Sequence, residues 1–195
     1  MNDAARVRQA IAAGIRECGE NRCQELVEKN AQGAYEGAKL HFIGHLQKNK
    51  LNKLVGVCDI IQSVDSHDLL AAISQKALAK GIRQNVLIEI NAGREENKSG
   101  VMPEAADELI ASAAGLDGVC VKGIMSIPPR HENNGQIYNY FDELCKIYVD
   151  IGAKKYDNTD MCVLSMGMTA DFEAAILAGA TMVRIGSGIF GQRHY

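Results

Sequence analysis

The sequence lacks several features that mark particular classes of protein. It contains no tryptophan, and its formal net charge is only −3 over 195 residues. A nucleic-acid-binding surface requires a cluster of basic residues, which this charge balance does not indicate. The longest apolar runs are interrupted well short of the roughly 20 residues that span a bilayer. We therefore expect neither nucleic-acid binding nor a membrane protein.

Paired cysteine motifs and an export signal are also missing. The six cysteines are dispersed and include no Cys-x-x-Cys motif, so the spacing of structural zinc sites is absent. The first segment, "MNDAARVRQAIAAG", is charged and helix-like rather than a secretory signal. We therefore expect a cytoplasmic protein whose cysteines are reduced and pack as small core residues.

What the sequence does contain is a regular alternation of short apolar runs and helical stretches. Its 47% hydrophobic and 23% charged residues are typical of a soluble globular protein, and the length suits a single domain, residues 1–195. Several runs are apolar on consecutive residues, as in strands covered on both faces. We predict seven strands, at 14–19, 39–44, 58–64, 85–93, 118–127, 161–167 and 181–186.

The helices between these strands have recognisable ends. We predict one over 67–81 with Asp65 or Ser66 as its N-cap, and one over 170–179 with Thr169 as its N-cap. The longest helix has one apolar face, with residues at three- and four-residue steps. That face consists of Ile137, Tyr140, Phe141, Leu144 and Ile147.

Alternating strands and helices indicate a parallel sheet, either open and doubly wound or closed as a barrel. The open fold usually has a G-x-G-x-x-G turn after its first strand, and none occurs near this N-terminus. The glycine turns, "SMGMT" and "RIGSG", follow the last two strands, where barrels commonly hold phosphate. We predict an α/β fold, a TIM-type (β/α)8 barrel whose first strand is missing.

The two glycine turns have the chemistry of a phosphate-binding site. Gly186 lets backbone N–H groups approach an anion, and Ser187 adds a hydroxyl donor. The preceding turn contributes Ser165, the backbone at Met166 and Gly167, and the N-terminus of the next helix. For the glycines alone, tight packing between strand and helix is the alternative.

Arg184 and Asn21 are further candidates, each with two interpretations. Strand alternation sends Arg184 and Gly186 toward the same face, and an interior arginine needs an anion or an acceptor. Arg184 therefore meets either a ligand or a carboxylate at the barrel mouth. Asn21 follows a strand end and either contacts a ligand or caps the next helix.

The stretch "HFIGHLQKNK" contains two histidines four residues apart. That spacing aligns metal ligands only on a helix, and this segment is a strand passing into a loop. We expect no metal at His41 and His45. We expect His45, Gln47 and Asn49 to form hydrogen bonds along the rim.

Five stretches, in order along the chain, resemble signatures of the pyridoxal phosphate homeostasis proteins, the YggS/PROSC family. They are "GENRCQE", "HFIGHLQKNK", "NAGREENKSG", "GIMSIPP" and "LSMGMTADFEAAILAGATMVRIGSGIFG". The resemblance implies a barrel like the N-terminal domain of alanine racemase that holds pyridoxal 5'-phosphate (PLP) in vitamin B6 and amino-acid homeostasis, without a dedicated catalytic activity. It implies phosphate contacts at Ser165, Gly167, Gly186 and Ser187, Arg184 near the pyridine nitrogen, and Asn21 near the ring.

The resemblance also implies a lysine that this sequence does not show. The family's first strand, of the form V-A-V-S-K, carries the lysine that forms a Schiff base with PLP. The chain starts just downstream, so we expect an N-terminally truncated member in which the covalent Schiff base is doubtful. Lys122 is three strands away from the gap and is not expected to substitute.

Two alternative functions stay open. A racemase-like or phosphate-substrate barrel enzyme would need a general base, and we find no paired carboxylates or nucleophile–base pair close to the turns. A non-binding truncated remnant would keep only the scaffold. We predict a PLP-binding protein whose partners are the cofactor and PLP-dependent apo-enzymes. Its predicted cofactor-binding residues are Asn21, Ser165, Met166, Gly167, Arg184, Gly186 and Ser187.

Overall fold

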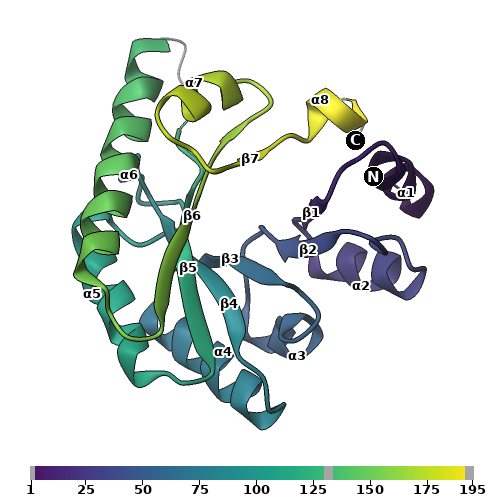
Figure 1. The fold of residues 1–195 in the computed structure, drawn as a ribbon, viewed down its shortest axis with the longest axis horizontal. Coiled ribbons are helices and arrows are strands. Elements are labelled where there is room, and N and C mark those ends of the chain that lie inside the picture. Colours follow the sequence, from purple (N-terminus) through teal and green to yellow (C-terminus); the bar gives the residue numbers. More distant parts are fainter. Residues whose placement is uncertain (1–2, 130–133, 192–195) are drawn as a thin grey trace.

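The computed structural model describes residues 3–129 and 134–191. Its strands form one parallel sheet in which each strand pairs with the next along the chain (Figure 1). All seven predicted strands are confirmed, with shifted ends. They are β1 (Glu17–Glu20), β2 (Lys39–Phe42), β3 (Ile60–Val64), β4 (Gln84–Ile90), β5 (Val119–Ser126), β6 (Thr159–Met168) and β7 (Met182–Arg184).

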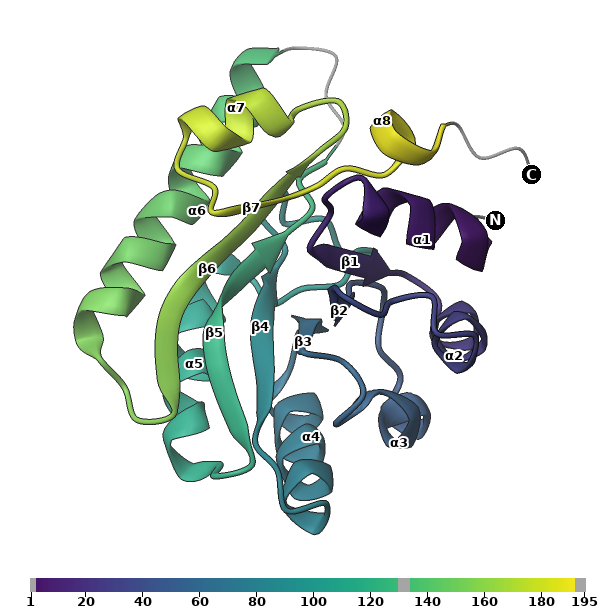
Figure 2. The ribbon, with the colours of Figure 1, turned by 45° about the vertical axis from the view of Figure 1, so that its right-hand side comes forward.

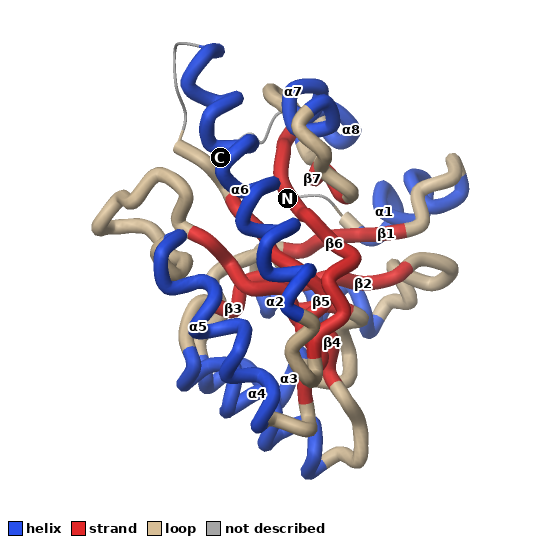
Figure 3. Tube along the Cα trace, turned by 60° about the vertical axis from the view of Figure 1, so that its left-hand side comes forward, coloured by secondary structure: helices blue, strands red, loops and turns tan. Residues whose placement is uncertain are grey.

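Helices connect the strands and cover the outer face of the sheet (Figure 3). The α-helices are α1 (Ala4–Ala12), α2 (Cys23–Ala31), α3 (Leu51–Leu54), α4 (His67–Ala79), α5 (Ala106–Ala111), α6 (Asn134–Lys154), α7 (Phe172–Leu177) and α8 (Ser187–Phe190). Short 3-10 helices lie at η1 (Lys48–Lys50), η2 (Pro103–Ala105) and η3 (Ser112–Gly115). None of the helices in the described ranges is long and apolar enough to cross a membrane.

The sheet curls into a nearly closed barrel, which confirms the predicted fold class (Figure 2). Within the described chain, β1 and β7 are the two edge strands and do not pair with each other. Helices α1 and α8 lie side by side near this opening, where Arg6 Nη1 donates to the carbonyl oxygen of Phe190 at 3.4 Å. The opening therefore falls next to β7, whose C-terminal end carries one of the predicted phosphate-binding turns.

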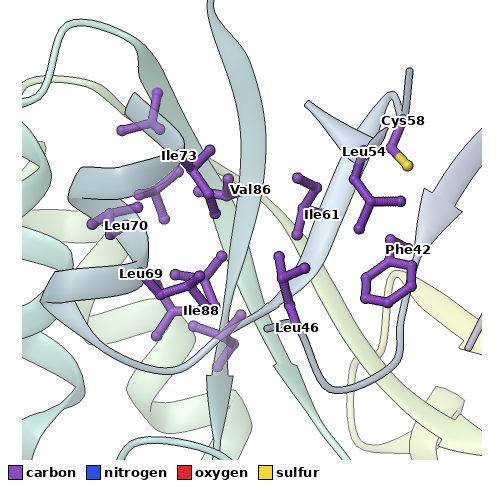
Figure 4. Packing of buried hydrophobic residues seen from close by; sticks show 14 of the residues in the cluster. Phe42, Leu46, Leu54, Cys58, Ile61, Leu69, Leu70, Ile73, Val86 and Ile88 are labelled. Carbon is purple, nitrogen blue, oxygen red and sulfur yellow. The ribbon is translucent and has the colours of Figure 1, made fainter. Parts of the chain in front are cut away.

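The main core lies between the outer face of the sheet and the helices (Figure 4). In β4, Val86, Ile88 and Ile90 belong to this core and are at most 1% exposed. Burying each such side chain contributes about 1.5–3 kcal/mol to folding. Because side chains alternate along a strand, Leu87 and Glu89 point to the other face, into the barrel interior.

The last predicted helix starts later than expected, and its predicted cap is wrong. Helix α7 begins at Phe172, with Asp171 at the N-cap position. A turn precedes it, closed by a hydrogen bond from Asp171 N to Met168 O at 3.1 Å. The Asp171 carboxylate also accepts from Met168 N at 2.5 Å. Thr169 therefore lies inside this turn, where its side chain is available to another loop.

Candidate functional site

The predicted binding residues gather at one end of the barrel. In a parallel sheet the carboxyl ends of all strands meet at the same edge, which we call the mouth. Arg184 is the last residue of β7, and Gly186 and Ser187 follow it after one residue. Ser165 is near the end of β6, and Asn21 follows β1. The topology thus brings residues from both halves of the sequence to the mouth.

The two glycine turns are joined by a threonine side chain. The backbone N–H groups of Gly186 and Gly188 donate to Thr169 Oγ1 at 3.3 and 3.2 Å. Ser187 is exposed and is the first residue of α8, so its N–H has no acceptor within the helix. We call Thr169, Gly186, Ser187 and Gly188 the cradle. It offers two hydroxyl groups and a free N–H to an anion.

The glycines of the two turns serve different purposes. A Cβ on Gly167, whose φ is +89°, would lie 2.5 Å from Ala175 Cβ, and one on Gly188 would lie 3.1 Å from Thr169 Cγ2. At both positions the packing interpretation accounts for the glycine. A Cβ on Gly186 would meet nothing within 4 Å. Packing therefore does not explain the glycine at position 186. The open space beside Gly186 leaves room for a ligand.

A chain of hydrogen bonds crosses the barrel interior beneath the mouth. Arg184 Nη1 donates to Ser165 Oγ at 2.6 Å, and Ser165 Oγ donates to Gln62 Oε1 at 2.7 Å. Gln62 Nε2 donates in turn to His41 Nδ1 at 2.9 Å. Burial lowers the pKa of His41, which favours the neutral ring that this bond requires. Ser165 is fully buried, and its hydroxyl is engaged with protein groups.

Arg184 meets uncharged acceptors rather than a carboxylate. Its Nη2 donates to the carbonyl oxygen of Ser126 at 2.8 Å, in addition to the bond with Ser165. Among the described residues it forms no ion pair within 4.0 Å. Burial lowers the pKa of Arg184 to about 10, which leaves it positively charged at neutral pH. The mouth therefore holds a fixed cation beside the cradle.

Two carboxylates also lie at the mouth, at the ends of β3 and β4 rather than in the two glycine turns. Val64 of β3 pairs in register with Ile88 of β4, so Asp65 lies beside Glu89. Burial and the charge of Asp65 raise the pKa of Glu89 to about 7, against the opposing effect of Arg184. Because Glu89 and Arg184 interact electrostatically, the carboxylates and the cation share one region.

The structure decides one alternative for Asn21. The N-cap of α2 is Arg22, and it has no side-chain hydrogen bond, so the interpretation of Asn21 as a helix cap is wrong. Asn21 instead lines a cavity of about 290 Å³, together with His45 but with none of the cradle residues. Met166 is fully buried in the core, so only its backbone is available to a ligand. Ligand contact by Asn21 and Met166 stays a prediction.

The two histidines of "HFIGHLQKNK" lie as the strand-to-loop interpretation requires. His41 is in β2, and His45 lies in the following loop, 3.2 Å from Ser99 Oγ through Nδ1. No group of three or more metal-ligating side chains occurs in the part of the chain that the structure describes. All six cysteines are free thiols.

Lys122 lies at the opposite end of the barrel from the cradle. It is in the first half of β5, and its Nζ is 2.6 Å from Asp160 Oδ2 near the start of β6. Hydrogen bonding to Asp160 raises the pKa of Lys122. Both residues line a cavity of about 570 Å³ whose lining contains no cradle residue. A protonated, paired amine at that end is unsuited to reach a ligand in the mouth.

Three site residues were not identified from the sequence. Thr169 was assigned to a helix cap, and Gln62 and Glu89 were treated as parts of apolar strands. A polar or charged residue inside the runs "CDIIQSV" and "NVLIEINAG" was the available signal. Since a buried strand excludes unpaired polar groups, each such residue indicates an interior partner or a ligand.

Sequence comparison identifies relatives across nearly the whole chain. Residues 2–194 match the family model of the alanine racemase N-terminal domain. A pyridoxal phosphate homeostasis protein of Aquifex aeolicus is 42% identical over 194 residues, covering 97% of this chain and 82% of that protein. The protein of the same name from Escherichia coli K12 is 35% identical over 195 residues, covering 98% of this chain and 82% of that protein.

Solved structures agree with this assignment. PipY of Synechococcus elongatus, solved with PLP bound, superposes with a TM-score of 0.88 at 29% identity, covering 97% of this chain and 88% of PipY. Its form without PLP gives a TM-score of 0.90. An alanine racemase of Clostridium difficile shares the fold, with a TM-score of 0.80 at 13% identity over 98% of this chain and 51% of the racemase.

Proposed function

Because this chain belongs to the pyridoxal phosphate homeostasis proteins and contains the alanine racemase N-terminal domain, we propose that it binds PLP at the mouth of its barrel. We further propose a cytoplasmic carrier in vitamin B6 and amino-acid homeostasis, without a dedicated catalytic activity. Its partners are then the cofactor and the PLP-dependent apo-enzymes that receive it.

The cradle is the observation that carries this proposal. Its Thr169 hydroxyl accepts from two glycine amides and keeps its own proton for donation. The Ser187 hydroxyl and N–H are exposed beside it, and Gly186 leaves open space. A phosphate dianion needs several converging donors and no nearby side-chain bulk. The residues present therefore fit the phosphate of PLP.

Arg184 would then meet the pyridine ring, as the family resemblance implies. PLP supplies an aldehyde and an electron-withdrawing ring when it is bound. A guanidinium does not protonate the ring nitrogen as a carboxylic acid would, so the ring stays a weak electron sink. The fixed charge of Arg184 and its bonds to Ser165 and Ser126 support a carrier role over catalysis.

We expect PLP to bind this chain without a covalent bond. Two described lysines lie on strands: Lys39 begins β2 and Lys122 lies in the first half of β5. Both positions are toward the end of the barrel opposite the mouth. A strand lysine beside the cradle is therefore not part of the described structure, and binding would rest on phosphate and ring contacts.

Titration with PLP, followed by absorbance, tests the proposal. We expect saturable binding, weakened at least about tenfold by Gly186→Leu, because the side chain fills the open space. Ser187→Ala should weaken it about tenfold through loss of one charge-assisted hydrogen bond. Gly115→Leu is the matched control, since a Cβ there also meets nothing within 4 Å and the residue ends η3.

Two results would contradict the proposal. Unchanged affinity in both cradle variants would remove the cradle from the site, and no binding at saturating PLP would favour a non-binding remnant. Borohydride reduction followed by peptide mapping addresses attachment. An adduct fixed on one specific lysine would contradict non-covalent binding.

A racemase-like barrel enzyme is the second candidate, and one observation favours it. The pKa of Glu89 is raised to about 7, which suits a general base at neutral pH. Incubation of the PLP-loaded protein with L-alanine, followed by chiral analysis, separates the candidates. Formation of D-alanine that Glu89→Gln abolishes would favour the enzyme, whereas no turnover would favour the carrier.

A further inference from the structure

Glu89 is a buried residue whose carboxylate has no partner among the described residues. The residue is 9% exposed, and its side chain forms no hydrogen bond or ion pair within the described parts of the chain. Leaving a buried charged group without hydrogen bonds is costly. Such a group in a binding region indicates a ligand that completes its bonding.

The surroundings of Glu89 do not meet this need. Asp65 lies beside it through the register of β3 and β4 and has the same charge. The hydrogen bonds of Arg184 go instead to Ser165 Oγ and to the carbonyl oxygen of Ser126. Ser126 pairs in register with Ile90, the residue after Glu89. The cation is therefore close enough to interact with the carboxylate but does not bond to it.

The mouth is thus divided by charge. The cradle and Arg184 lie at the ends of β6 and β7 and suit an anion. Asp65 and Glu89 lie at the ends of β3 and β4 and suit a cation. Both groups lie at the same end of one curled sheet (Figure 2). A ligand with a phosphate and an ammonium group would satisfy both sides.

We propose that Glu89 and Asp65 bind the ammonium group of a phosphorylated amine whose phosphate occupies the cradle. This inference rests on the proposed PLP site and extends it to the aminated form of the cofactor, pyridoxamine 5'-phosphate. The ammonium group supplies three donors and a positive charge to the unpartnered carboxylate. Binding is reversible, and no covalent bond forms.

Two cofactor forms of nearly the same shape make a matched pair of probes. Pyridoxamine 5'-phosphate carries an ammonium group where pyridoxine 5'-phosphate carries a hydroxyl. We expect the protein to bind the amine at least about tenfold more tightly at pH 8, since an ammonium group forms an ion pair with the carboxylate and an uncharged hydroxyl does not. Isothermal titration calorimetry measures both dissociation constants without an enzymatic readout.

Glu89→Gln should remove this preference selectively. The variant keeps the size of the side chain and removes its charge, so we expect the two dissociation constants to differ by less than about threefold. Asp65→Asn should reduce the preference less, because Asp65 is more exposed than Glu89.

The outcomes separate this inference from the proposed function. If the protein binds PLP but binds the amine and the alcohol equally, the inference is wrong and the PLP site stands. If none of the three forms binds, both are wrong. The comparison of the two probes on the unaltered protein decides the inference even if Glu89→Gln does not fold.

Discussion

Buried polar residues in this barrel differ in whether protein groups satisfy them. Ser165 and Gln62 lie in a continuous chain of hydrogen bonds between Arg184 and His41. Such a chain restrains the orientation of the side chains that it joins. Glu89 has no comparable partner, so it lowers the stability of the unliganded fold. The proposed ammonium site gives Glu89 a role in binding rather than in folding.

This cost predicts how stability depends on pH. Glu89 has a pKa of about 7 in the folded state, raised from its ordinary 4.5, so between these values the folded state holds a proton that the unfolded state has lost. Stability therefore falls as pH rises from about 4 to 8, by roughly 3 kcal/mol from this residue. Glu89→Gln should remove that part of the dependence and stabilise the protein at pH 8.

Urea unfolding of both proteins at pH 5 and pH 8 measures this difference. The variant's advantage in free energy of unfolding should be larger at pH 8 than at pH 5. An advantage that is equal at the two pH values would show that Glu89 is not held with a raised pKa. Glu96→Gln, which removes an exposed carboxylate from the loop after β4, is the control for the change of charge.

At the scale of elements, the site depends on two turns that hold each other. The turn before α7 presents Thr169, and the turn before α8 presents the amides of Gly186 and Gly188 to it. The first turn requires a left-handed backbone at Gly167, which packs against α7. The geometry of the cradle therefore depends on a close contact between β6 and α7.

Gly167→Ala tests that contact. Its φ of +89° is unfavourable for alanine, and the new methyl would lie 2.5 Å from Ala175 Cβ. We expect a loss of at least about 1–3 kcal/mol in the free energy of unfolding, measured with urea. The matched variant Gly186→Ala has open space and should change stability by less than about 0.5 kcal/mol. Equal effects of the two substitutions would contradict the packing role of Gly167.

The sequence allowed the elements to be predicted better than their ends or contacts. Apolar runs located several of the strands because a strand covered on both faces is largely apolar. Thr169 was misassigned because Asp171, two residues later, also caps helices well and forms the turn. The link from Gln62 to Ser165 was not predictable, since it joins residues 103 positions apart in the chain. Such contacts depend on the curvature of the whole sheet.

At the scale of the molecule, one continuous core supports one sheet. Buried residues from Val7 in α1 to Ala175 in α7 belong to a single cluster, and we propose that residues 1–195 form one domain. Within that domain the strands differ in the number of residue pairs that join them to their neighbours. β4 and β5 pair at seven positions, whereas β6 and β7 pair at two. The cradle follows β7 and is thus attached to a weakly held edge.

This asymmetry predicts the order of hydrogen exchange. Amides of β4 and β5 should exchange slowest, near the rate of global unfolding, whereas those of β1 and β7 should exchange through local opening. Phosphate binding at the cradle should slow exchange in β7 and leave β4 unchanged.

Mass spectrometry at two protein concentrations provides the control, because association of exposed edges would protect β1 and β7 only at the higher concentration. Uniform protection of all seven strands at low concentration would contradict a weak edge. In that case the cradle would be as rigid as the core, and phosphate would bind to a site that is already formed.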